Sequence, residues 1–230
     1  NGVTFDQAVL TDATFEGLDL RELNFGSAIL RGANMNDTCL QDTGFVQSDM
    51  REMTLWNADA TNAEFLSAVL ADAEFGGAIL SGADFSGANL TRAQLDSTYA
   101  DGTSFVGAIA NGTNFTNATL IRSVAAGVFV LGADLSEARI LDSDLRSAVF
   151  LDVQFSDARY GRPTTFEGSN LTDAALRNLR MTGVDLRNVD ASYADFRGSD
   201  LSLTVLKNTS LEGATFRDTQ LWNADLRAKT

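Results

Sequence analysis

The reactive side chains of this sequence are mainly carboxylates, hydroxyls and guanidinium groups. The sequence contains no histidine. It has 31 Asp and Glu, 17 Lys and Arg, and one cysteine, Cys39. The lack of His removes the commonest general base and metal ligand, and one thiol makes neither a zinc site nor an internal disulfide. Ser and Asp are abundant, but none resembles a nucleophile paired with a base, and no Asp-x-Asp-x-Asp-Gly calcium loop occurs. We therefore predict no enzyme, no catalytic residue, no cofactor and no metal site.

These polar groups are carried on a five-residue repeat. An apolar residue recurs at every fifth position from Phe5 to Tyr160, and after one extra residue the repeat resumes from Phe166 to Leu226. A small residue, most often Ala, stands two positions before most of these centres. A period of five fits neither a helix nor a flat strand. A fixed period is instead the signature of a repeat architecture.

The phenylalanines indicate how many repeats make one coil. Phe recurs every twenty residues from Phe5 to Phe105, and we expect Phe166 to rejoin this column after the one-residue shift. A three-sided coil of fifteen residues would scatter these residues over all of its sides, so the pattern favours four sides. We place a second set on the opposite side: Phe15, Phe75, Phe115, Phe155, Phe196 and Phe216.

Individual repeats resemble the A(D/N)LXX unit of pentapeptide-repeat proteins. The clearest units are Ala58-Asp59-Ala60, Ala83-Asp84-Phe85, Ala88-Asn89-Leu90, Ala133-Asp134-Leu135 and Ala224-Asp225-Leu226. The resemblance implies an all-β fold, a right-handed quadrilateral β-helix of about eleven coils with four pentapeptides each. It covers nearly the whole chain, so we predict a single solenoid domain over 1–230. The family shares a shape rather than an activity.

One irregularity interrupts the repeat between Tyr160 and Phe166. The intervening segment, 161–165, contains the only proline of the chain, Pro163. Proline lacks a backbone donor and fixes its own φ, so we expect a one-residue bulge or small corner loop there, with a regular register over 3–160 and 166–226. The segment is either a tolerated insertion or a contact loop that presents Arg159 and Arg162.

The residues beside each centre should point outward, and one outward column is apolar. A contiguous exposed apolar cluster usually marks a contact surface, whereas β-branched residues also favour an extended wall for its own sake. On the first interpretation the cluster docks a protein partner or a second copy. Its predicted members are Ile109, Phe129, Leu131, Val149 and Leu151 on this side, together with Val106 and Val124 from the adjoining side.

Basic residues in the second half are predicted to align as well. Arg139, Arg159 and Arg180 should occupy one outward position in successive coils, with Arg162 nearby. Such a column can bind carboxylates or phosphates of a partner. Alternatively it neutralises neighbouring carboxylates of the chain itself.

Acidic charge is concentrated in the first half. Residues 1–115 hold 16 acidic and 4 basic residues, a net −12, whereas residues 116–230 hold 15 and 13, a net −2. If the first half spans roughly 27 Å, it carries about one net charge per 2.3 Å, close to the roughly 1.7 Å of B-DNA. The resemblance adds that quinolone-resistance members of the family mimic DNA and bind gyrase, a type II topoisomerase. The alternative function is therefore a DNA mimic acting through the acidic N-terminal half.

We favour a non-catalytic rigid rod that serves protein–protein interaction or assembly. Its partner would be another protein, or a second copy bound through the apolar side or the open ends, with no direct nucleic-acid binding. No apolar run approaches the roughly 20 residues of a membrane span. Asn1 is not an initiator Met, so we expect a processed or trimmed chain, from which any targeting signal could have been removed. An organellar lumen or the periplasm is then as compatible as the cytoplasm.

Overall fold

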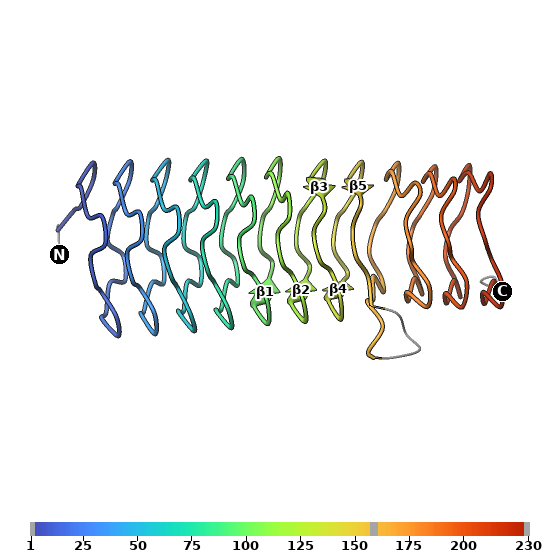
Figure 1. The fold of residues 1–230 in the computed structure, drawn as a ribbon, viewed down its shortest axis with the longest axis horizontal. Helices are drawn as coiled ribbons and strands as arrows, with labels where there is room; N and C mark the ends of the chain where they lie inside the picture. The colour runs from blue at the N-terminus through green and yellow to red at the C-terminus, as the bar shows by residue number, and fades with distance from the viewer. Residues whose placement is uncertain (1–2, 157–160, 228–230) are drawn as a thin grey trace.

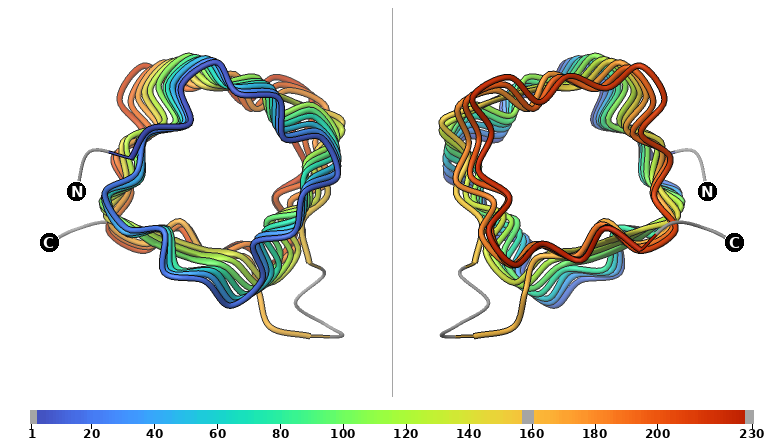
Figure 2. Two further views of the ribbon diagram at one scale, coloured as in Figure 1. Left: turned by 90° about the vertical axis from the view of Figure 1, so that its left-hand side faces the viewer. Right: turned by 90° about the vertical axis from the view of Figure 1, so that its right-hand side faces the viewer.

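The chain forms a long rod of stacked coils. The computed structural model describes residues 3–156 and 161–227. Figure 1 shows the coils following one another from the N-terminal to the C-terminal end, and Figure 2 shows that they superpose into a four-sided outline when viewed along the rod. The predicted right-handed, four-sided β-helix is thereby confirmed. Within the described ranges, no helix is long and apolar enough to cross a membrane.

Successive coils are joined by parallel backbone pairing. Thr4 pairs with Asn24, twenty residues later, and the same offset recurs along all four sides. The Phe5 amide donates to the Asn24 carbonyl at 2.7 Å, and the Ile29 amide donates to the Ala8 carbonyl at 2.9 Å. Each coil therefore advances the rod by about one strand spacing, roughly 4.8 Å.

Continuous strands occur in the middle of the rod. β1 (Tyr99–Asp101), β2 (Thr119–Ile121) and β4 (Arg139–Leu141) form one parallel sheet in that order. β3 (Phe129–Leu131) and β5 (Val149–Leu151) pair in parallel on another side of the rod. Other sides of the described coils pair through isolated bridges.

The corners explain the polar residues of the repeat. The Ala8 amide donates to the Phe5 carbonyl at 2.9 Å and closes a turn, and Gln7 in that turn has a φ of 57°. This left-handed conformation favours Gly, Asn and Asp. The residue before the centre also serves the turn, because the Asn24 side-chain oxygen accepts the Gly26 amide at 2.8 Å.

The interior is a ladder of like residues. Phe rings stack face to face from Phe5 to Phe105, with centroids 4.6 to 5.3 Å apart. Most hydroxyl-bearing residues two positions before a centre are buried, and the Thr103 hydroxyl donates to the Leu80 carbonyl of the previous coil at 2.7 Å. The tube is thus lined by apolar side chains, and among the described residues no buried hydroxyl lacks a hydrogen-bond partner.

The ladder is interrupted next to β3 and β5. Phe105 is followed in its column by Ala125, and the adjoining column holds Ala110. The missing side-chain volume leaves an apolar cavity of about 50 Å³ inside the tube, between Phe115 and Phe150.

The break near Pro163 is larger than the predicted one-residue bulge. Arg139 pairs with Thr165, and the same offset joins Ser143 to Ser169, 26 residues apart. An offset of 26 in place of 20 means that six residues are inserted. The sequence suggested one, because insertions of one and of six residues leave the same five-residue register. Ser156 closes the loop by donating its hydroxyl to the Arg162 carbonyl at 2.6 Å.

The larger insertion also changes the predicted columns. Phe166 continues the column of Leu120 and Ile140 rather than that of Phe5. Phe196 and Phe216 stack in the column that contains Phe150, not in the column of Phe15.

Candidate interaction surface

β3 and β5, with the neighbouring bridge residue Ile109, bring five of the predicted contact residues together on one side of the rod. We call this side, whose outward bridge residues run from Val9 to Thr215, the Phe129 side. Ile109 pairs with Phe129, and Phe129 pairs with Val149. Leu131 lies beside Leu151 in the same strand pair. Figure 1 shows both strands on the upper edge of the rod.

The other two predicted residues lie on the adjoining side. Val124 pairs with Ser104 and Asp144 there, and Val106 precedes the corner that leads to Ile109. All seven predicted side chains are exposed or half-buried. We call this set the apolar patch: Val106, Ile109, Val124, Phe129, Leu131, Val149 and Leu151.

The predicted basic column does not form. Arg139 pairs with Thr119 and Thr165, and Arg180 pairs with Asp200 on a different side. Arg162 is exposed at the base of the loop, and Arg159 lies outside the described residues. The prediction assumed that coils on either side of the break differ by twenty-one residues, whereas they differ by 26.

A different row of arginines lies on the Phe129 side. Arg177, Arg197 and Arg217 occupy one outward position in successive coils, since the Asn178 amide bonds to the Arg197 carbonyl and the Gly198 amide to the Arg217 carbonyl. We call these three residues the arginine row. Sequence reasoning missed it, although the spacing of twenty was the available signal.

Two members of the row share one carboxylate. Asp195 accepts a short hydrogen bond from Arg177 Nε and pairs with Arg197 Nη2 at 2.7 Å. The Asp195 side chain is only 14% exposed, against 52% for Arg177 and 45% for Arg197. The hydrogen bond from Arg197, with a further one from Arg177, holds the pKa of the Asp195 carboxyl well below its usual range. The guanidinium groups therefore form the outer surface, above a carboxylate that stays ionised.

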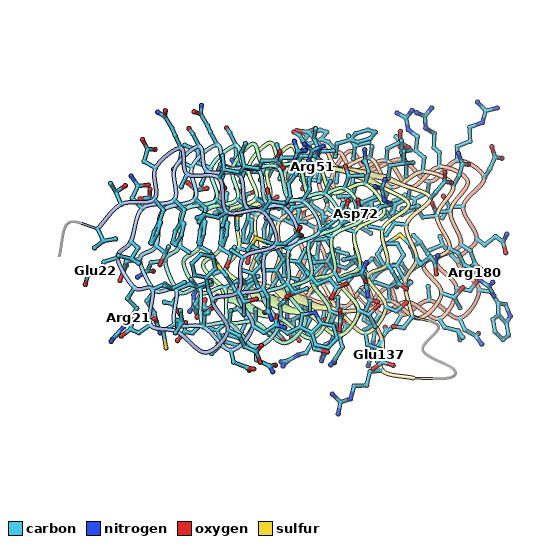
Figure 3. All side chains as sticks on the ribbon, turned by 60° about the vertical axis from the view of Figure 1, so that its left-hand side comes forward. Arg21, Glu22, Arg51, Asp72, Glu137 and Arg180 are labelled. Carbon is cyan, nitrogen blue, oxygen red and sulfur yellow. The ribbon has the colours of Figure 1, made fainter. Side chains whose placement is uncertain are left out.

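The same arrangement occurs near the N-terminal end of this side. Asp49 pairs with Arg51 at 2.8 Å and with Arg31 at 2.7 Å. These bonds, that from Arg51 first, lower the pKa of the Asp49 carboxyl. Figure 3 shows Arg51 on the upper side of the rod. The coils of Val69 and Asn89 separate this triad from the apolar patch.

The depressed pKa gives Asp195 a pH-dependent share in stability. Such a carboxylate stabilises the fold above its unfolded pKa of about 3.9 and loses this contribution as the pH falls through the folded pKa. We expect Asp195→Asn to lower the free energy of unfolding by up to about 1 kcal/mol at neutral pH, because its exposed Arg partners are screened by solvent.

Urea unfolding across a pH series measures this effect. The difference between Asp195→Asn and the unchanged protein should shrink steadily below about pH 4. Asp152→Asn, which removes an exposed carboxylate on the same side, should change stability little at any pH. A loss from Asp195→Asn that is the same at every pH contradicts the role given to the triad.

Other reactive groups are sparse among the described residues. Cys39 is a free, exposed thiol. In the part of the chain that the structure describes, no cluster of three or more His, Cys, Asp or Glu side chains could hold a metal ion.

A protein-family model matches most of the chain. Its description is "Pentapeptide repeats", with eight copies. The matched residues are 8–45, 48–87, 88–124, 169–208 and 204–228. No curated protein matches the chain.

Solved structures with the same repeat also match. HetL, a pentapeptide repeat protein involved in heterocyst differentiation regulation from the cyanobacterium Nostoc sp. strain PCC 7120, aligns at a TM-score of 0.60 and 22% identity, over 96% of this chain and 87% of that chain. QnrB1, a plasmid-mediated fluoroquinolone resistance protein, aligns at a TM-score of 0.43 and 16% identity, over 86% and 89%. A pentapeptide repeat protein from the Arabidopsis thaliana thylakoid lumen shares 28% identity at a TM-score of 0.21, over 45% and 68%. The likeness to HetL bears on the fold alone.

Proposed function

The chain belongs to the pentapeptide repeat family, and from that premise we propose that this non-catalytic repeat scaffold binds another protein through its apolar patch. The observation that carries the proposal is the pairing of β3 with β5, which sets exposed apolar side chains next to one another on a flat wall. Exposed apolar clusters are typical of contact surfaces. The rest of the rod would keep this wall rigid.

The composition of the patch supports a contact role over a purely structural one. β-branched residues favour extended walls, which accounts for Ile109 and Val149. It does not account for Leu131 and Leu151, which are 39% and 38% exposed and not β-branched.

The test is a double substitution with a matched control. We expect Phe129→Asp with Leu131→Asp to weaken partner capture from the native source at least about tenfold, because the partner's apolar groups would lie against two charges. The control is Ile79→Asp with Leu66→Asp. Ile79 occupies the same position of the repeat as Phe129 but on another side of the rod, and its side chain is 42% exposed against 40% for Phe129. Leu66 follows a centre as Leu131 does, and it is 41% exposed against 39% for Leu131. Both variants add the same charge, and both should keep the circular dichroism of the fold.

Quantitative mass spectrometry of the captured proteins reads out this test. A protein recovered with the unchanged chain and with the control, but not with the patch variant, supports the proposal. The same set of proteins from all three removes the patch from consideration.

A second candidate is the DNA mimic. It is favoured by the net −12 of residues 1–115 and by a shallow groove at one corner of the first coils, lined by Asp6, Glu22, Asp42 and Glu64. Closely spaced carboxylates of this kind can occupy a basic DNA-binding groove. A gyrase supercoiling assay tests it, and no effect at micromolar protein eliminates this candidate.

A further inference from the structure

We propose that the apolar patch and the arginine row are one binding surface, and that its partner is a protein segment with apolar side chains followed by carboxylates. This inference rests on the proposed protein-binding function and adds the chemistry of the partner. It concerns the Phe129 side from Ile109 to Arg217.

The two features are continuous in the fold. Leu131 pairs with Leu151, and the pairing of Val149 with Ala175 places Arg177 directly after Leu151 in the same outward column. Five coil steps, of about 4.8 Å each, separate Ile109 from the coil of Arg217. The surface is therefore roughly 24 Å long, apolar at one end and cationic at the other, which suits a helix of about 16 residues at 1.5 Å per residue.

The cationic end is arranged to receive carboxylates. Asp195 accepts hydrogen bonds from Nε of Arg177 and from Nε and Nη2 of Arg197. Each guanidinium group has five N–H donors in a planar fork, so donors remain free to point outward. The outer edges can then bind an incoming carboxylate in bidentate fashion. Arg217 extends the row. Its side chain is 84% exposed, and its Nε lies 3.5 Å from Oδ2 of Asp218.

Charge argues for an acidic partner segment over the other occupants of such a wall. The chain as a whole has a net charge of −14, but this end of the surface presents three exposed guanidinium groups, which attract carboxylates and repel the arginine row of a second copy. The phosphates of a nucleic acid could bind the arginine row, but they would also lie against the apolar patch, which offers them no hydrogen-bond donor. An apolar and acidic segment matches both ends of the surface.

The experiment uses two labelled peptides of about 18 residues with the same Leu- and Phe-containing half. The other half is rich in Glu in one peptide and in Lys in the other. Fluorescence anisotropy should show the Glu peptide binding about tenfold more tightly, as expected for two carboxylate–guanidinium contacts of about 0.7 kcal/mol each. The preference should decrease as salt is added.

Matched variants locate the preference. Arg177→Gln with Arg197→Gln should abolish it. Arg31→Gln with Arg51→Gln removes the equivalent triad on the same side, which is separated from the patch, and should leave the preference intact.

Several outcomes overturn the inference. These are equal binding of the two peptides, tighter binding of the Lys peptide, no measurable binding of either, or an equal effect of both Arg pairs. Binding to vesicles of anionic lipid in place of the Glu peptide would assign the surface to a membrane and also overturns it. If capture of a partner still depends on Phe129 and Leu131, the proposed function survives such a failure. If capture does not depend on them, the proposed function fails by itself.

Discussion

Replacing Phe65 by Ala should lower the free energy of unfolding by about 3–5 kcal/mol, the cost of lost burial plus the cavity left behind. Phe65 is fully buried, stacks on Phe45 at 5.2 Å and on Phe85 at 4.6 Å, and meets Phe75 edge to face at 5.8 Å. The coils above and below are held in register by backbone bonds, so they cannot easily collapse into the gap. In a solenoid each coil is stabilised by its neighbours, and both neighbours lose contacts.

Denaturant unfolding followed by circular dichroism measures this loss. Leu66→Ala, at the next position and 41% exposed, is the control and should change stability by no more than about 0.5 kcal/mol. Equal effects of the two substitutions would mean that the stacked column does not stabilise the rod.

Enlarging two buried alanines should have opposite effects. Ala125→Val adds two carbons at the edge of the cavity of about 50 Å³, and we expect it to raise the free energy of unfolding by about 1 kcal/mol, at about 0.8 kcal/mol per buried methylene less the entropy of ordering it. Ala60→Val makes the same change at a fully buried centre that does not line the cavity. There we expect a loss of about 1–3 kcal/mol from overpacking.

Thermal and urea unfolding of the two variants side by side check the sign. Stabilisation by both substitutions would show that the tube is loosely packed throughout. Destabilisation by both would show that the space beside Ala125 does not accept a side chain.

The sequence predicts the fold well because the place of a residue in the five-residue repeat decides whether its side chain points inward or outward. The Phe column from Phe5 to Phe105, the inward small residues and the polar turns all follow from that register, and the structure confirms them. The apolar patch was likewise predictable, since its residues all precede the break.

The arginine row was not predicted from the sequence, because the break at Pro163 changes the side on which each later residue lies. A five-residue register cannot distinguish an insertion of one residue from an insertion of six, so every column after Pro163 was assigned to the wrong side. The spacing of twenty between Arg177, Arg197 and Arg217 was available, but its continuity with Leu151 depends on the bridge between Val149 and Ala175.

The cavity could not be predicted from the sequence either, because it depends on which side chains face one another inside the tube. Alanine centres occur at Ala60, Ala100, Ala110 and Ala125, and of these four Ala110 and Ala125 line the cavity. Ala60 is fully buried and does not line this cavity, a difference that the linear sequence does not reveal.

Photo-crosslinking tests most directly the claim that the Phe129 side is the surface that binds the protein partner. A photoreactive phenylalanine analogue is placed at position 129 or, as a control of matched exposure on another side, at position 79, and each protein is irradiated in extract from the native source. The account predicts a discrete crosslinked protein from position 129 and none from position 79. Crosslinking from position 79 alone, or to the same extent from both positions, would contradict it.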